Sequence, residues 1–352
     1  LLPEVADYQP SEKGEAPLAR NQDWVQYADG GRRETDTMPG SAGSSWYFLR
    51  YCDPHNDDAF CDFDLQKYWM PVDLYVGGAE HTVGHLLYSR FWQKVLFDAG
   101  LVSHDEPFQK LAHQGVILGP DGERMSKSRG NVVNPDSVRE QYGADVLRAY
   151  VMFLGPMDAD KPWQENGIGG VQRFLDRLWR AAVSEDGVSI ADSAALPEEL
   201  NKLLHKTIKK VGDDLDAMAF NTAISALMIL LNEVYKTGSR SKLVLMPLAQ
   251  MVAPFAPHVA EELWEKMGGE GFVALAPWPK FDSALTVDSV VSIGVQVNGK
   301  SRGVIEIDKD ASEEAAVAAA LSVPSVQNAM GGKPADKVIY KAGRILNLIV
   351  KS

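Results

Sequence analysis

Apolar residues recur at two different spacings along this chain of 352 residues. Between about residues 135 and 277 they return every three or four positions, as they do when one face of an α-helix is buried. Successive segments with this spacing predict a helix bundle. The segments are 138–153, 170–183, 201–218, 221–235 and 243–267.

The first third of the chain has shorter apolar runs. Residues 72–78 form a β-rich run that ends in Gly77 and Gly78, and residues 113–118 form a second such run, followed by a turn at Gly119–Glu123. Residues 80–99 lie between the two runs and have helical spacing. A strand, a helix and a strand in a domain of this size predict part of a doubly wound parallel sheet, an α/β fold.

The last part of the chain alternates between apolar and polar residues. The alternation spans residues 290–307 and is centred on Asn298-Gly299, which is a strong signal for a β-hairpin. Residues 312–321 predict a short helix, and residues 338–350 end in another β-rich run. These elements predict a small α+β unit.

Four parts are therefore expected. The first 20 residues are rich in Pro, Glu and Gly and predict an extended connector. The fold class is α/β, followed by all-α, followed by a small α+β unit. The expected bounds are 1–20 for the connector, 21–134 for half of the α/β domain, 135–284 for the helix bundle and 285–352 for the α+β unit.

Composition narrows the class of protein. Apolar residues make up 45% and charged residues 24% of the chain, which is close to average globular usage. No stretch has the length and purity of a membrane span, and the first residues do not form a signal peptide, so no membrane partner is expected. Cys52 and Cys61 show neither a metal-ligand pattern nor a disulfide framework, which favours the cytoplasm.

Charge limits the modes of nucleic-acid binding. The formal net charge of −13 argues against a protein that coats nucleic acid without specificity. It leaves room for a local basic face, because only charges near the phosphates interact strongly with them.

The strongest chemical signal is the run Arg124-Met125-Ser126-Lys127-Ser128, followed by Arg129-Gly130-Asn131. A mobile ammonium group and hydroxyl donors can stabilise negative charge that grows on phosphate oxygens during a reaction. Glycines at positions 119, 122 and 130 would let such a loop close over a nucleotide. The alternative is a solvated basic loop that precedes a helix.

A second signal combines Tyr75, Gly77-Gly78, Glu80, His81 and His85. Glycines at the carboxyl end of a strand allow a ligand to approach the backbone. Glu80 can accept hydrogen bonds from two ribose hydroxyls, and histidines four residues apart share one helix face. Two alternatives remain for the histidines, a zinc-binding pair and a pair of ordinary core residues.

The two signals resemble the KMSKS signature of class I aminoacyl-tRNA synthetases and the GG-x-E-H segment of leucyl-tRNA synthetases. The resemblance covers essentially the whole chain and implies the C-terminal portion of a bacterial-type enzyme. It implies a leucine pocket formed by Tyr47, Tyr75, His81 and His85. It implies ATP binding by Gly77, Gly78, Glu80, Gln114, Gly115, Arg124, Met125, Ser126, Lys127 and Ser128, with Lys127 catalytic. From the residues alone, Gln114 and Gly115 equally fit an ordinary buried strand.

The same resemblance implies contacts with tRNA(Leu) from the bundle and the small C-terminal unit. Phosphate contacts of this kind position the RNA rather than specify its sequence. A solvated charged face is the alternative for each basic residue. The implied tRNA-binding residues are Trp163, Arg173, Arg177, Lys206, Lys210, Lys300 and Arg302.

The implied activity is leucine–tRNA ligation. ATP with Mg²⁺ would be the substrate complex, and no protein-bound metal is expected. The HIGH signature of the family is absent, so a partner is expected that carries it, either an N-terminal half or a subunit; the alternative is a non-catalytic tRNA-binding fragment. Three departures stand out, namely Arg124 for the usual Lys, Gly84 within the expected helix, and Gly40-Ser41 for a bulkier pair.

Overall fold

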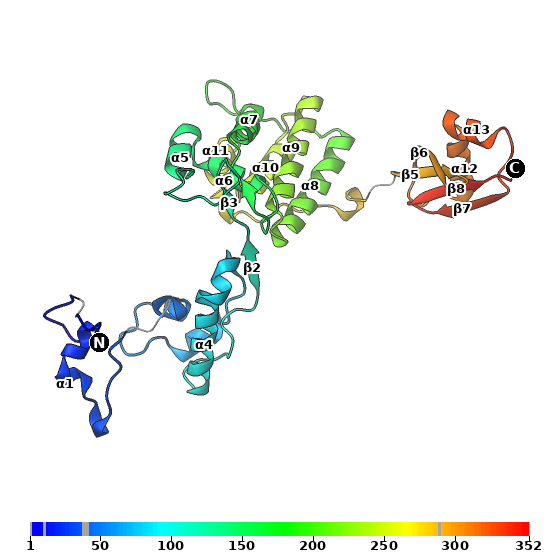
Figure 1. Ribbon diagram of the computed structural model, residues 1–352. Helices are drawn as coiled ribbons and strands as arrows, with labels where there is room; N and C mark the ends of the chain where they lie inside the picture. The colour runs from blue at the N-terminus through cyan, green and yellow to red at the C-terminus, as the bar shows by residue number, and fades with distance from the viewer. Residues whose placement is uncertain (1, 10–11, 37–41, 288–289, 352) are drawn as a thin grey trace. The chain divides into compact units, whose positions relative to one another are not determined.

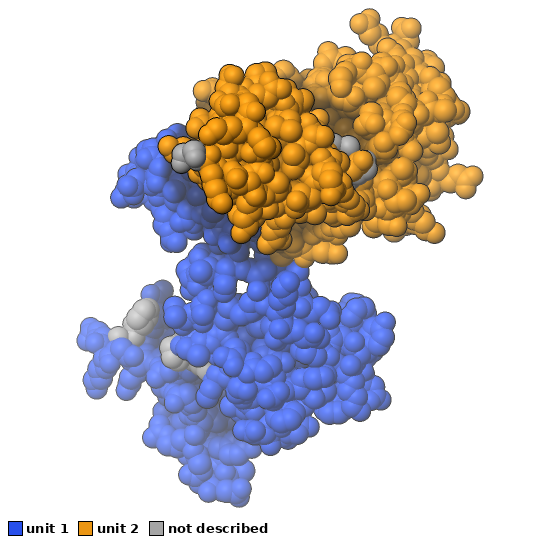
Figure 2. All heavy atoms as spheres, turned by 90° about the vertical axis from the view of Figure 1, so that its right-hand side faces the viewer, with its two compact units in different colours: residues 1–132, 157–163 blue, residues 133–156, 164–352 orange. Residues whose placement is uncertain are grey.

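The computed structural model describes residues 2–9, 12–36, 42–287 and 290–351. The chain forms two compact units (Figure 2), of which the first comprises residues 1–132 and 157–163 and the second residues 133–156 and 164–352. The first change of unit falls between residues 132 and 133, and residues 157–163 return to the first unit. The departure at Gly40-Ser41 lies outside the described residues.

Short helices precede the sheet in the first unit. One of these helices contributes Phe48 and Leu49 to a small core, which also contains Met70 and Val102. Asp62 caps one of them, since its carboxylate accepts hydrogen bonds from the backbone N–H groups of Asp64 and Leu65. These elements are η1 (Pro17–Arg20), α1 (Gln22–Val25), η2 (Ala28–Gly30), η3 (Gly43–Ser45), α2 (Tyr47–Cys52) and α3 (Phe63–Trp69).

A parallel pair of strands forms the centre of this unit. Strand β1 (Tyr75–Gly78) pairs with β2 (Leu111–Gln114), and Gly78 lies opposite Gln114 at their carboxyl ends. Between them run η4 (Ala79–Val83) and α4 (His85–Asp98) (Figure 1). The predicted strand–helix–strand order with parallel pairing is confirmed.

The helix expected at residues 80–99 is interrupted. Gly84 has φ −110° and ψ −102°, outside the helical region, and separates the 3₁₀ turn η4 from α4. His81 therefore lies in the turn, and His85 is the first residue of the α-helix. The prediction that these two histidines share one α-helical face is wrong, because a glycine without a side chain permits the break.

The strand expected at residues 113–118 is also divided. Strand β3 (Ile117–Leu118) leaves β2 and pairs in parallel with β4 (Lys161–Pro162). The change of partner occurs at Gly115, whose N–H donates to the Met157 carbonyl at 2.8 Å. The next N–H, of Val116, donates to the Asp160 carboxylate at 2.6 Å. The segment that returns from the second unit thus crosses the chain at this point.

The second unit contains the predicted helix bundle. Two of the expected helices are each divided, the first at Gly143, which has φ +89°, and the second before Pro257. The helices are α5 (Pro135–Tyr142), α6 (Ala144–Phe153), α7 (Glu165–Ala182), α8 (Glu198–Asp216), α9 (Phe220–Thr237), α10 (Lys242–Val252) and α11 (Pro257–Lys266), followed by η5 (Val273–Leu275) and η6 (Ser283–Leu285) (Figure 1). Among the described residues, none of the helices has the length and apolar character needed to cross a membrane.

The C-terminal part has its own sheet and core. The hairpin is confirmed, with Asn298 at φ +53° and Gly299 at φ +76°, the left-handed values of a two-residue turn. The strand order is β6-β5-β8-β7, and β5 and β8 are parallel. The elements are β5 (Val290–Val297), β6 (Lys300–Asp308), α12 (Glu313–Leu321), α13 (Pro324–Met330), β7 (Lys337–Lys341) and β8 (Ile345–Ile349). Helix α13 was not predicted.

Candidate active site

A cavity of about 460 Å³ opens at the carboxyl ends of β1 and β2. In parallel sheets this edge is the usual place for a ligand. The lining includes most of the predicted pocket residues together with others that the sequence did not indicate. The lining residues are Ser44, Tyr47, Tyr75, Val76, Gly77, Gly78, His81, His85, Leu86, Leu111, Ala112, His113 and Gln114.

Three of the predicted leucine-binding side chains are joined by hydrogen bonds. The Tyr47 and Tyr75 hydroxyl oxygens are 2.6 Å apart, and the Tyr75 hydroxyl lies 2.6 Å from His85 Nε2. Tyr75 also stacks on Phe108, with ring centroids 3.9 Å apart and an interplanar angle of 18°. Phe108 thus supports one wall of the cavity, a role that its position in the sequence did not indicate.

Burial keeps these groups in their neutral forms. It raises the pKa of Tyr75, with a further contribution from the hydrogen bond to Tyr47. It lowers the pKa of His85 below the ordinary 6.5, and the neighbouring His81 lowers it further. At pH 7 Tyr75 and His85 are therefore polar but uncharged, which suits an aliphatic ligand better than charged groups would.

The structure disfavours one of the two alternatives for the histidines, that of ordinary core residues. His81 is exposed and His85 half-buried, and both line the cavity, so they are not core residues. Within the described ranges, no group of three or more His, Cys, Asp or Glu side chains is arranged to hold a metal ion, so the pair lacks a third zinc ligand there.

Gly78 and Glu80 lie in close contact where β1 ends. A Cβ atom built on Gly78 would lie only 2.4 Å from a Glu80 carboxylate oxygen. The glycine therefore allows the Glu80 carboxylate to fold back over the end of the strand. Glu80 is exposed, and among the described residues no protein donor is bonded to its carboxylate, so it can accept hydrogen bonds from a ligand.

Gln114 lines the cavity, whereas Gly115 does not. A Cβ atom built on Gly115 would lie 2.1 Å from the carbonyl oxygen of Ala159. The N–H of Gly115 already donates to Met157. Gln114 and Gly115 were both predicted to lie beside an adenine ring. The returning segment occupies the N–H of Gly115, so this particular group is already bonded within the protein.

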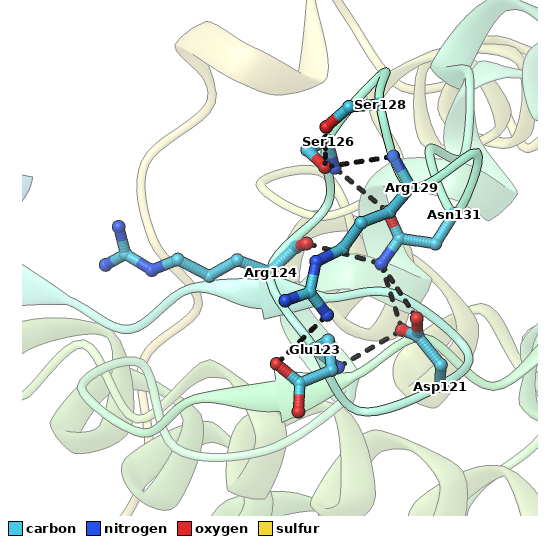
Figure 3. Close-up of polar contacts among 7 residues, drawn as sticks. All are labelled: Asp121, Glu123, Arg124, Ser126, Ser128, Arg129 and Asn131. Carbon is cyan, nitrogen blue, oxygen red and sulfur yellow. Dashed lines mark hydrogen bonds and ion pairs between the residues drawn. The ribbon is translucent and has the colours of Figure 1, made fainter.

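The lysine-containing loop is held at its base by Asn131 (Figure 3). The side chain of Asn131 donates to the Asp121 carboxylate and to the Arg124 carbonyl, and it accepts from the Ser126 N–H. Arg129 forms an ion pair with Glu123 at 3.4 Å. Neither Asp121 nor Asn131 was predicted as a site residue, although Asn131 lies only three residues after Ser128, the last residue of the run that carried the prediction.

The predicted phosphate-binding groups lie on the outer part of this loop. Lys127 and Ser128 are exposed, and Met125 and Ser126 are half-buried. The Ser126 and Ser128 hydroxyl oxygens are 3.2 Å apart. The side chain of Arg124 extends away from the hydrogen-bonded cluster in Figure 3. The loop thus presents a cation and hydroxyl groups to solvent.

The predicted tRNA-binding residues of the bundle differ in their surroundings. Arg173 is exposed on α7. The guanidinium of Arg177 donates to Asn232 at 2.8 Å and lies 4.5 Å from the ring centroid of Tyr235, so it joins α7 to α9. Lys210 pairs with Asp214 at 2.8 Å.

Trp163 requires a correction. Its side chain is only 5% exposed. A ring this deeply buried does not reach RNA, so the prediction of a direct contact is wrong. An indole is among the larger apolar side chains, and its burial here follows the general tendency of aromatic residues to pack inside.

Lys300 and Arg302 lie on β6 in the C-terminal unit, directly after the hairpin turn. Both residues are exposed. The backbone carbonyl of Arg302 accepts a hydrogen bond from the Ser325 hydroxyl of α13, which ties the strand to that helix. The two cationic side chains remain on the surface, where phosphate contacts are feasible.

Two protein-family models match parts of the chain. Residues 59–164 match the family described as tRNA synthetases class I (I, L, M and V). Residues 198–317 match the family described as the anticodon-binding domain of tRNA ligase. The first match contains the lysine loop and most of the cavity, and the second covers much of the bundle.

The chain is similar over its whole length to curated proteins named leucine–tRNA ligase. The relative from Bdellovibrio bacteriovorus is 66% identical over 100% of this chain, and the relative from Prosthecochloris aestuarii is 49% identical over 99%. The chain spans 44% of the length of each. A crystal structure of a ternary complex of Agrobacterium radiobacter K84 agnB2 LeuRS, tRNA and LeuAMS superposes with a TM-score of 0.77 at 34% identity, covering 96% of this chain and 45% of that one.

Proposed function

Because the chain belongs to the leucine–tRNA ligase family of class I aminoacyl-tRNA synthetases, we propose that it supplies the leucine pocket, part of the ATP site and tRNA-binding surfaces of such a ligase. The observation that carries the proposal is the hydrogen-bonded wall of Tyr47, Tyr75 and His85. This wall borders the cavity at the carboxyl ends of two parallel strands. The partner we propose is an N-terminal half or subunit that carries the HIGH signature.

The reaction has two steps. A leucine carboxylate oxygen attacks the α-phosphorus of ATP, the bond from that phosphorus to the bridging oxygen breaks, and pyrophosphate leaves with Mg²⁺ as part of the substrate complex. A hydroxyl at the 3′ end of tRNA(Leu) then attacks the leucyl carbonyl carbon, and AMP leaves. Negative charge grows on phosphate oxygens in the first step, so a positioned cation accelerates it.

We assign the leucine side chain to the wall formed by Tyr47, Tyr75, His81 and His85. Burial lowers the pKa of His85 and raises that of Tyr75, which favours the neutral forms of these two groups at pH 7. Aromatic and imidazole rings offer apolar faces to a branched aliphatic chain, and the polar atoms of Tyr47, Tyr75 and His85 are already bonded to one another. A pocket of this kind selects size and shape.

We assign the adenosine part of ATP to the ends of β1 and β2. Glu80, folded against Gly78, accepts the ribose hydroxyls, and Gln114 lies opposite Gly78 on the neighbouring strand. The loop that contains Ser126, Lys127 and Ser128 supplies the phosphate contacts. We also propose that the protein is located in the reducing cytoplasm, because Cys52 and Cys61 are free thiols.

ATP–pyrophosphate exchange tests the proposal. The enzyme to use is residues 1–352 preceded by the N-terminal part of the Bdellovibrio relative, expressed as one chain and called the completed enzyme below. Exchange is expected with leucine. Valine lacks one methylene and should be a poorer substrate than leucine. Its kcat/KM should be lower by about 10- to 200-fold, which is the discrimination that an apolar pocket can provide for one methylene. The parallel assays use isoleucine, valine and methionine.

His85→Ala is the matched variant for this test. It should raise the KM for leucine and leave the KM for ATP unchanged, since the imidazole is part of the leucine wall. Fastest exchange with another of the four amino acids would instead identify a different class I enzyme. Absence of exchange with all four, together with retained tRNA binding, would identify a non-catalytic tRNA-binding module.

We further propose that tRNA(Leu) contacts the exposed cations of the bundle and of the C-terminal sheet. The exposed residues that we assign to phosphates are Arg173, Lys300 and Arg302, and we also assign the half-buried Lys206. Arg177, Lys206 and Lys210 already have interactions within the protein, so a phosphate would share or displace them. Such contacts position the RNA rather than specify its sequence.

The affinity of residues 1–352 for tRNA(Leu) should fall steeply between about 50 and 200 mM salt, because each neutralised phosphate releases counterions. Lys300→Ala should weaken binding and reduce the salt slope by about one. The measurement is a filter-binding titration at several salt concentrations. Lys67→Ala, which removes a lysine paired with Asp64 in the first unit, is the control. A salt-independent affinity would contradict the assignment.

A further inference from the structure

The side chain of Asn131 forms hydrogen bonds to three different residues at the base of the lysine loop (Figure 3). Its Nδ2 donates to both carboxylate oxygens of Asp121 at 3.0 Å and to the Arg124 carbonyl at 3.2 Å. Its Oδ1 accepts from the Ser126 N–H at 2.9 Å. One amide therefore ties together points five, seven and ten residues away along the chain.

Asp121 orients this amide. Its carboxylate also accepts from the Glu123 N–H at 3.1 Å, which holds it in the turn. The hydrogen bond from Asn131 and that from the Glu123 backbone lower the pKa of Asp121, so the group is a carboxylate at neutral pH. A carboxylate accepts hydrogen bonds only, so the Asn131 amide must turn its NH₂ toward Asp121 and its oxygen toward Ser126.

Gly119 provides the space for this arrangement. A Cβ atom built there would lie 2.7 Å from Asp121 Oδ1 and 2.8 Å from Asn131 Nδ2. Gly119 also closes the turn, since its N–H donates to the Glu123 carbonyl at 2.8 Å. The pair Asp121–Asn131, which we call the clasp, thus packs directly over a glycine.

The clasp binds the backbone of Ser126, the residue that precedes Lys127. Ser126, whose N–H is bound by Asn131, begins a tight turn in which the Gly130 N–H lies 3.2 Å from the Ser126 carbonyl and 3.3 Å from the Lys127 carbonyl. The Arg129 N–H donates to the Ser126 hydroxyl at 3.3 Å. Lys127 is therefore presented from a short turn whose first residue is held by the clasp.

We propose that Asn131, oriented by Asp121, is a positioning residue that keeps the base of the loop in one conformation, so that Lys127 meets the triphosphate with a defined geometry. The proposal rests on the role assigned to Lys127 in leucyl-adenylate formation. Without the clasp, the loop would sample many conformations before each productive encounter, and ordering it would cost conformational entropy.

Asn131→Ala in the completed enzyme should slow single-turnover leucyl-adenylate formation by about tenfold, equivalent to about 1.4 kcal/mol. It should also raise the KM for ATP and leave leucine affinity unchanged. Asp121→Asn should lose less than Asp121→Ala, because an amide oxygen still accepts from Asn131. Lys127→Ala should cost far less in the Asn131→Ala background than alone, since coupled residues are not additive.

A matched control exists in the same unit. Asn56 donates to Asp53 at 2.7 Å and accepts from the Asp58 N–H at 2.9 Å, so it forms a similar Asn–Asp turn elsewhere. Asn56→Ala should keep the wild-type rate. A rate for Asn131→Ala within about twofold of wild type, well under 1.4 kcal/mol, or full additivity with Lys127→Ala, would overturn the proposal.

Hydrogen exchange tests whether the clasp holds the loop in one conformation, and it does not require catalytic activity. In residues 1–352 without ATP, the peptide that covers Gly119–Asn131 should exchange faster in Asn131→Ala and in Gly119→Ala, whose added methyl group displaces the clasp. Unchanged exchange in both would overturn the clasp. If the completed wild-type enzyme makes no leucyl-adenylate, the proposed function fails, and the exchange result still stands on its own.

Discussion

Replacement of Lys127 by alanine in the completed enzyme should lower the rate of leucyl-adenylate formation by about 100- to 1,000-fold, or about 2.7–4 kcal/mol. Lys127 is exposed on a loop that presents it to solvent, so its ammonium gains its partners only when the triphosphate is bound. The charge on the phosphate oxygens grows in the transition state. An interaction made mainly there appears in the rate constant rather than in ground-state affinity.

Single-turnover adenylate formation, measured beside equilibrium leucine binding, checks this expectation. Leucine affinity should not change, because leucine is assigned to the wall of Tyr47, Tyr75, His81 and His85. Lys67→Ala is the matched control, since Lys67 is also exposed in the first unit and its contacts are with Asp64 and Phe63 on its own helix. A Lys127→Ala rate within about threefold of wild type, well under the tenfold that corresponds to about 1.4 kcal/mol, would show that the loop has another role.

Lys127 also illustrates how much of the site the sequence could predict. The chemistry of the loop and of the cavity wall follows from residue types in short runs, and the parallel strands that bring Gly78 beside Gln114 follow from apolar patterning. These features are local or depend on one regular pairing. Tyr47 joins Tyr75 across 28 residues of chain, and it was predicted from the family resemblance and not from spacing.

The predictions that were wrong or incomplete have physical causes that the spacing of apolar residues in the sequence does not show. Gly84 and Gly143 interrupt apolar patterns that are helical on both sides, because periodicity reports burial and not backbone continuity. Trp163 looks like a surface aromatic beside polar neighbours, and only tertiary packing shows that it is buried. Asp121 and Asn131 become a pair only when the turn between them is closed.

Gly115 is a position whose importance comes from a crossing of two segments. The glycine was predicted as part of the ATP site, but the structure shows that the Met157–Lys161 segment passes against it. Its N–H donates to Met157, and the following N–H donates to Asp160. At this crossing β2 ends and β3 begins its pairing with β4. A side chain at position 115 would therefore disturb two sheets at once.

Gly115→Ala is expected to destabilise the first unit by about 3 kcal/mol or more, at the upper end of the costs measured for overpacking. The added Cβ would lie 2.1 Å from the Ala159 carbonyl oxygen and 2.7 Å from the Asp160 nitrogen. Both are backbone atoms, so no side-chain rotation relieves the overlap. The crossing must open, which loses the hydrogen bonds to Met157 and Asp160.

Hydrogen exchange of residues 1–352 measures this loss locally, which matters because a chain of two units does not unfold in one step. Peptides of β2 and of the Met157–Lys161 segment should lose protection, while peptides of α9 in the second unit should keep theirs. Gly43→Ala is the control, since a Cβ built on Gly43 meets nothing within 4 Å. Equal protection of β2 in both variants would contradict the prediction. It would mean that the Met157–Lys161 segment leaves more room at Gly115 than the distance of 2.1 Å between the added Cβ and the Ala159 oxygen implies.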